Sequence, residues 1–215
     1  MCQSWLSMIL VDRTGPVWTI TLNRPEKANA LTAEMLSDLV NIVEAANEAR
    51  ALILTGNGKV FSAGADFEAA RSGLATSPDW ERLSSAIAGL PGLTIAALNG
   101  TLAGGANGMA LACDLRIAVP NASFFYPVLK HGYLPQPSDP LRMARLIGAA
   151  RTKMVFLTGQ KLTAQTALSY GLIDEIVKEK SVLSRAMDLC FTVSAADPVK
   201  SKRIKAMCNT GLYMH

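Results

Sequence analysis

The sequence predicts an α/β protein in which strands alternate with helices and a helical region follows at the C-terminal end. In the first two thirds of the chain, short apolar runs alternate with segments whose apolar residues recur every three or four positions. From about residue 139 onward the spacing is helical almost throughout. Because helices separate the strands of the first part, those strands are expected to run parallel.

Short apolar runs bounded by turn residues mark the expected strands. The first two runs flank a turn at residues 13–16, where Gly15 and Pro16 interrupt the apolar pattern. A later run is closed by the turn residues Gly56, Asn57 and Gly58, which is typical of a buried strand. The predicted strands are residues 8–11, 17–22, 51–55, 94–98, 115–119 and 123–125, with a short extended piece at 172–177.

Apolar stripes and capping residues mark the expected helices. Thr32 is a predicted N-cap, because a threonine hydroxyl can accept a hydrogen bond from the first helical turn. Pro91 and Gly92 stop a later helix. The predicted helices are residues 33–47, 77–90, 108–113, 142–147, 151–158, 164–170, 182–194 and 198–209.

The composition indicates one domain, or one core with a helical extension. Half of the 215 residues are apolar and 18% are charged. A chain of this length can bury roughly 70% of its unfolded surface. The net charge is +4, and the basic residues are scattered apart from Lys178, Lys180 and a cluster at residues 200–205. No aromatic residues interleave with that cluster, which argues against nucleic-acid binding and leaves a solvated helix face or a contact to an anionic ligand such as a phosphate.

The cysteine and histidine content argues against a metal centre. The four cysteines lack the spacing of a metal knuckle or a redox pair, and two histidines supply few further ligands. The N-terminus has neither the basic nor the long apolar segment of a signal peptide, and no run reaches the ~18 apolar residues of a membrane span. These features predict a reduced, cytoplasmic protein with no metal and no membrane contact.

Two glycine-rich loops are the strongest functional signal. Residues 61–67 (FSAGADF) and 99–108 (NGTLAGGANG) each open onto a segment that can start a helix. Backbone N–H groups at a helix N-terminus point outward, so one N–H from each loop can meet on a single carbonyl oxygen. That arrangement is an oxyanion hole, which stabilises the enolate or tetrahedral oxyanion of a thioester. Taken alone, each loop also fits a simple tight turn.

Several stretches resemble one known family, and they occur in the family's order. They are residues 21–31, 51–56, 61–66, 99–118, 125–135 and 158–174. Through them the chain resembles the crotonase superfamily, the enoyl-CoA hydratase/isomerase family, over nearly its whole length. The resemblance implies a crotonase-like ββα superhelix, an acyl-CoA thioester substrate and a homo-oligomer, either a trimer or a hexamer. It also implies coenzyme A as part of the substrate and no covalently bound cofactor.

The resemblance also assigns roles to individual residues. The N–H groups of Ala65 and Gly105 would form the oxyanion hole. Asp66 would help to shape the adenine pocket, mostly through its backbone. The residues expected along the coenzyme A channel are Lys27, Ala28, Ala30, Ala63, Asp66 and Phe67.

Three positions at which family members carry acids lack a carboxylate here. Family hydratases carry glutamates at the positions of Gly108 and Val128, and some isomerases and dehalogenases use an aspartate at the position of Gln136. Hydration needs a base to activate water and an acid to protonate the α-carbon. Gln136 can form hydrogen bonds but cannot titrate, so ordinary hydration loses its proton-transfer groups.

Nearby residues offer partial replacements, each with a structural alternative. His131 is either a structural, partly exposed residue or a general base that works at neutral pH. Asp139 is either the N-cap of a helix that starts near Pro140 or a displaced carboxylate. Tyr126 and Tyr133 can donate hydrogen bonds, and core or rim packing is the alternative for both.

Together these features predict an acyl-CoA enzyme of the lyase or isomerase type whose reaction is non-standard, such as thioester hydrolysis or decarboxylation. The alternative is a catalytically inactive acyl-CoA-binding or scaffold homologue. We expect a crotonase-like core at residues 1–195 and a short C-terminal helical segment at 196–215, with the family's final helices absent.

Overall fold

The computed structural model describes residues 7–178 and 181–210, and its frame is a six-stranded sheet. The strands lie in the order β1 (Ile9–Asp12), β2 (Val17–Leu22), β3 (Ala51–Gly56), β5 (Leu93–Leu98), β7 (Leu115–Ala118) and β10 (Glu175–Ile176). β1 pairs antiparallel with β2, and every later pairing in this sheet is parallel. The central strands β3 and β5 are buried along almost their whole length, as expected for parallel strands covered on both faces.

A second, smaller sheet stands beside the first. Its strands lie in the order β4 (Val60–Ser62), β6 (Thr101–Ala103), β8 (Ser123–Phe125) and β9 (Leu162–Thr163). β3 leads into β4, β5 into β6 and β7 into β8, and a helix follows each pair. This repeat is the predicted ββα architecture. Of the four short strands only β8 was predicted, because a run of two or three residues is too short to show alternation.

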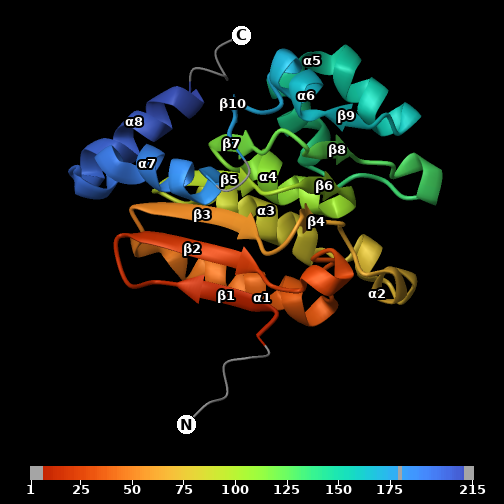
Figure 1. Ribbon diagram of the computed structural model, residues 1–215, viewed down its shortest axis with the longest axis horizontal. Helices are drawn as coiled ribbons and strands as arrows, with labels where there is room; N and C mark the ends of the chain where they lie inside the picture. The colour runs from red at the N-terminus through yellow and green to blue at the C-terminus, as the bar shows by residue number, and fades with distance from the viewer. Residues whose placement is uncertain (1–6, 179–180, 211–215) are drawn as a thin grey trace.

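Helices flank the sheets, and all of them except the short α2 overlap helices that the apolar stripes predict. They are α1 (Ala33–Glu44), α2 (Phe67–Arg71), α3 (Asp79–Gly89), α4 (Asn107–Ala112), α5 (Asp139–Thr158), α6 (Ala164–Tyr170), α7 (Val182–Ala195) and α8 (Pro198–Thr210). In Figure 1, α7 and α8 lie at the left of the molecule and α5 and α6 at the upper right. α1 packs against α3, α3 against α4, and α7 against β3 and β5. Among the described residues, none of the helices has the length and apolarity to cross a bilayer.

Helix boundaries follow local signals closely. Thr32 caps α1, since its hydroxyl oxygen accepts a hydrogen bond from the N–H of Met35 at 3.2 Å. The two helices predicted at 142–147 and 151–158 are the two halves of α5, separated at Gly148, where φ is 79° and ψ is 158°. These angles are accessible to glycine at little cost. The predictions of the cap and of the interruption are therefore confirmed.

The C-terminal helix α8 is tied to the sheet by side-chain contacts. Lys205 donates a 2.8 Å hydrogen bond to the carbonyl of Gly92 and forms a 2.7 Å ion pair with Asp114. Arg50 bonds the carbonyl of Ala196 just before this helix. One member of the basic cluster at 200–205 thus has a structural partner within the protein. The division of the chain at residue 195 stays a prediction.

Asn29 fastens the loop at residues 24–31 to the sheet. Its side chain is fully buried and accepts a hydrogen bond from the N–H of Arg24 at 2.8 Å. The same amide donates to the carbonyls of Asn57 and Val60 at 2.9 and 2.7 Å. Asn29 has a positive φ of 51°, which asparagine tolerates better than most residues. The Asn29 amide therefore links the loop at residues 24–31 to Asn57 and to the start of β4.

We expect Asn29→Ala to lower the free energy of unfolding by about 2–4 kcal/mol, because three backbone groups, partly buried, lose their partners and alanine is strained at this φ. Urea unfolding followed by circular dichroism measures the change. The matched control is Asn41→Ala on the exposed face of α1, which should change stability by no more than about 0.5 kcal/mol. Equal effects of the two substitutions would contradict the anchoring role of Asn29.

Candidate active site

A cavity of about 340 Å³ lies where the ends of β4 and β6 meet the segment that follows β8. Both glycine-rich loops contribute to its wall. The lining includes six predicted site residues, namely Ala63, Ala65, Phe67, Gly105, His131 and Gln136. Trp80, Tyr126, Val128, Tyr133 and Leu134 also contribute. The structure therefore brings together segments that are separated by 70 or so residues of sequence.

The two loops touch each other at Gly64. Its φ is +92°, and a β-carbon here would lie 2.9 Å from the carbonyl oxygen of Ala103 and 3.4 Å from the nitrogen of Gly105. A contact of 2.9 Å with backbone is one that real β-carbons do not make. Glycine at position 64 is thus required both by the backbone angle and by the close approach of the second loop.

The backbone of Ala65 is oriented by a bridge to Leu31. The N–H of Leu31 donates to the carbonyl of Gly64, and the N–H of Asp66 donates to the carbonyl of Leu31, both at 2.8 Å. In this parallel pattern Ala65, which lies between the two bonded groups, turns its own N–H away from Leu31. Gly105 belongs to the short 3-10 helix Gly104–Ala106 that leads into α4, and N–H groups in a first turn have no acceptor within the helix.

Trp80 forms the floor beneath Gly105. Its side chain is 3% exposed, and the indole N–H donates to the carbonyl of Leu74 at 2.8 Å. A β-carbon at Gly105 would lie 3.3 Å from the indole ring. Trp80 is not among the predicted site residues, because only the packing of α3 against α4 places it there.

Asp139 is fully buried beside Gly108. A β-carbon at Gly108 would lie 3.1 and 3.2 Å from the two carboxylate oxygens of Asp139. Tyr126 donates a hydrogen bond from its hydroxyl to Oδ2 at 3.0 Å, while Oδ1 accepts none from the described residues. The guanidinium of Arg142 lies 3.9 Å from Oδ1.

The predicted N-cap role of Asp139 is wrong. The N-cap of α5 is Ser138, and it forms no side-chain capping bond; Asp139 is the first residue of the helix itself. Ser138 instead bonds Glu81 on α3 through both its backbone N–H and its hydroxyl. The Asp139 side chain is thereby directed into the core and away from the helix terminus.

Burial changes the pKa values of Asp139 and Tyr126. It raises the pKa of Asp139 from 3.8 to about 7, although the hydrogen bond from Tyr126 and the charge of Arg142 act in the opposite direction. Glu81 adds to the rise. Burial also raises the pKa of Tyr126, and the neighbouring Asp139 raises it further. Asp139 can therefore hold or release a proton near neutral pH, while Tyr126 stays neutral.

Comparison with known proteins identifies the fold and the family. The family model described as enoyl-CoA hydratase/isomerase matches residues 12–215. This chain belongs to the enoyl-CoA hydratase/isomerase family. It is 31% identical to the short-chain-enoyl-CoA hydratase of Clostridium acetobutylicum, covering 96% of this chain and 83% of that protein.

Two further comparisons also point to this family and fold. The chain is 35% identical to the carnitinyl-CoA dehydratase of Salmonella enteritidis, covering 91% of this chain and 77% of that protein. The crystal structure of an enoyl-CoA hydratase from Bacillus anthracis superposes with a TM-score of 0.87 at 32% identity, covering 97% of this chain and 85% of that one. The predicted crotonase-like fold is thus confirmed.

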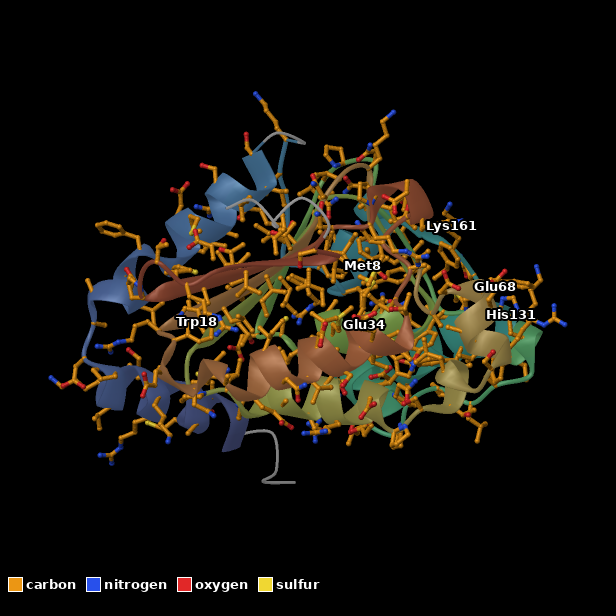
Figure 2. All side chains as sticks on the ribbon, turned by 90° about the horizontal axis from the view of Figure 1, so that it is seen from below. Met8, Trp18, Glu34, Glu68, His131 and Lys161 are labelled. Atoms are coloured by element: carbon orange, nitrogen blue, oxygen red, sulfur yellow. The ribbon has the colours of Figure 1, made fainter. Side chains whose placement is uncertain are left out.

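The three positions at which the resemblance expects acids lie at different places in the structure. Gly108 lies on α4 against the Asp139 carboxylate. Val128 and Gln136 both line the cavity. His131 ends the 3-10 helix Leu129–His131 and is exposed. Figure 2 shows its side chain reaching outward at the edge of the molecule.

The predicted channel residues lie around the first loop. Lys27 is exposed and Ala28 has a φ of 52°, with its carbonyl bonded by the N–H of Ala63 at 3.0 Å. Asp66 pairs with Arg24 at 2.8 Å, which holds the pKa of this carboxyl below its usual value.

Asp66 also caps α2 by accepting hydrogen bonds from the first-turn N–H groups, so its carboxylate is already engaged. Ala30 is buried, and Phe67 is 74% exposed at the cavity. No three histidine, cysteine, aspartate or glutamate side chains within the described ranges gather as a metal site would require.

The raised pKa of Asp139 predicts a pH-dependent stability. Between pH 3.8 and about 7 the Asp139 carboxyl holds more proton in the folded protein than in the unfolded chain, so its contribution to stability falls as pH rises through this window. Asp139→Asn removes this contribution. The free energy of unfolding of the variant minus that of the wild type should therefore increase by up to about 4 kcal/mol between pH 4 and pH 8.

Urea unfolding at several pH values measures this gain. Asp188→Asn on the exposed face of α7 is the matched control, and its pH curve should run parallel to that of the wild type. A parallel curve for Asp139→Asn would contradict the buried, proton-holding state of Asp139.

Proposed function

We propose that this family member binds an acyl-CoA thioester in the cavity and holds the thioester carbonyl oxygen with the N–H groups of Ala65 and Gly105. The observation that carries this proposal is the backbone contact at Gly64, which sets the two loops side by side on one cavity. The bridge to Leu31 and the first turn before α4 leave both N–H groups without an acceptor in their own elements.

Two such donors favour reactions that place negative charge on the carbonyl oxygen. The charge of an enolate or of a tetrahedral intermediate grows at that oxygen, and donors fixed in advance need no reorganisation to stabilise it. Each donor of this kind contributes about 3 kcal/mol to the transition state. The lining of small alanines lets the backbone approach the ligand closely.

The loop at residues 24–31 and the first glycine-rich loop would form the channel for coenzyme A. Lys27 offers an exposed ammonium group near the ligand's phosphates, and Ala28, Ala30 and Ala63 offer small side chains and backbone groups. Asp66 would contribute backbone atoms, because its carboxylate is engaged with Arg24. Phe67 supplies an exposed apolar surface at the mouth. We further propose assembly as a trimer or hexamer, by analogy with the family.

The side chains around the cavity favour hydrolysis or decarboxylation over hydration. The lining contains no aspartate or glutamate within the described part of the chain, and hydration needs both an acid and a base at the substrate. In decarboxylation the breaking C–C bond supplies the electron pair, so an oxyanion hole contributes without a base. His131 lines the same cavity and is the candidate general base for hydrolysis.

Gly105→Pro should abolish turnover, because proline has no N–H to donate. Gly105→Ala is the matched control, since it adds the same β-carbon against Trp80 at 3.3 Å but keeps the N–H. Turnover of an acyl-CoA panel, followed by mass spectrometry, measures the difference. We expect Gly105→Pro to fall at least about 100-fold below Gly105→Ala. Equal turnover in the two variants would overturn the oxyanion-hole assignment.

A second candidate is an acyl-CoA-binding homologue without turnover. The absence of a carboxylate from the described cavity lining supports it. Incubation with crotonyl-CoA, malonyl-CoA and saturated acyl-CoA esters separates the two candidates. Binding without any product would favour the binding protein. Product formation that is lost in His131→Ala or Asp139→Asn would favour the enzyme.

A further inference from the structure

We propose that Tyr126 exchanges a proton with the α-carbon of the bound thioester and that Asp139 positions Tyr126 and receives or returns the tyrosine's own proton. This inference rests on the proposed function, because the thioester must first be held at Ala65 and Gly105. It adds a proton-transfer pair that lies outside the three positions at which the resemblance expects acids.

Tyr126 connects the cavity with the buried carboxylate. It lines the cavity, its side chain is 1% exposed, and its ring is fixed against Phe156 at a centroid distance of 5.0 Å. Its hydroxyl donates to Asp139 Oδ2 at 3.0 Å. Asp139 itself has no exposed surface, so a proton on its carboxylate passes to the cavity through the tyrosine hydroxyl.

The Asp139 carboxylate occupies the space that a side chain at position 108 would fill. The two oxygens of Asp139 lie 3.1 and 3.2 Å from the position of a β-carbon at Gly108. A larger residue on α4 and the aspartate on α5 cannot both fit there without a shift. The chain therefore places a buried carboxylate from α5 where the resemblance expects a glutamate from α4.

The charged surroundings leave both protonation states of Asp139 accessible. Arg142, on the same helix, lies 3.9 Å from Oδ1, and its guanidinium donates to the hydroxyl of Ser84 on α3 at 2.7 Å. Glu81, also on α3, faces the cluster through Ser138. From α4 the facing residue is the uncharged Gly108. Oδ1 lacks a hydrogen-bond donor among the described residues, which favours the protonated form, in line with a pKa near 7.

The proton step balances without a cofactor. The α-C–H bond breaks, its electron pair forms the enolate, and the negative charge rests on the oxygen held by the two N–H groups. The proton moves to the oxygen of Tyr126 as the tyrosine's own proton moves to the carboxylate of Asp139. The reverse step returns a proton to the α-carbon. In decarboxylation of a malonyl-type thioester, protonated Asp139 and Tyr126 deliver one proton to the enolate, and water restores it.

Exchange of the α-hydrogens of butyryl-CoA in D2O tests this step with a saturated probe. Mass spectrometry follows deuterium uptake, and calorimetry measures binding of the same probe. We expect the wild type to exchange and Tyr126→Phe to exchange at least about 100-fold more slowly with binding nearly unchanged. The matched control, Tyr170→Phe, removes a tyrosine hydroxyl on α6 outside the cavity lining and should exchange like the wild type.

Asp139→Asn provides a second readout, the pH dependence of the exchange rate, which a purely structural role of Asp139 would leave unchanged. The wild-type exchange rate should rise with pH through about 7, because the ionised carboxylate is the form that accepts the tyrosine proton. In Asp139→Asn this rise should disappear and the rate should stay low, while Asp188→Asn keeps the wild-type profile. This variant also tests the proposal if Tyr126→Phe fails to fold.

The outcomes separate this inference from the proposed function. Binding of butyryl-CoA without exchange in the wild type, or undiminished exchange in folded Tyr126→Phe, would overturn the proton pair and leave the thioester site standing. Failure of the wild type to bind any acyl-CoA ester would overturn the proposed function itself. Exchange that is lost in Tyr126→Phe and has lost its pH step in Asp139→Asn would support the pair.

Discussion

The contact between two backbone loops at Gly64 is the constraint on which the cavity depends. A side chain at this position would collide with the carbonyl of Ala103, and the loops would have to separate. Asn29 holds the neighbouring loop in place through three hydrogen bonds, and Leu31 orients Ala65 through the bridge. These interactions are all made by backbone or buried amide groups.

The buried pair of Tyr126 and Asp139 forms a second layer behind that wall. An unpaired carboxylate is costly to bury, and here the cost is reduced by one hydrogen bond, by the nearby Arg142 and by a proton held near neutral pH. Glycine at position 108 makes the space for it. Such a perturbed carboxyl next to a cavity is typical of functional sites.

Much of the fold was predictable because its signals are local. The stripe behind Thr32, the interruption at Gly148 and the long strands of the main sheet follow from periodicity and from turn residues. The small sheet was mostly missed, since its strands are two or three residues long and are defined by their partners. The N-cap assignment of Asp139 failed because Ser138 and the bonds to Glu81 direct its side chain inward.

The sequence by itself determined the family, the two glycine-rich loops and the absence of carboxylates at positions 108, 128 and 136, because these are properties of residue identity and order. Only the tertiary structure decided that Trp80 underlies Gly105 and that Asp139 fills the space beside Gly108. The physical reason is that these are contacts between separate elements, and burial at such a contact is what shifts the pKa of Asp139 toward neutrality.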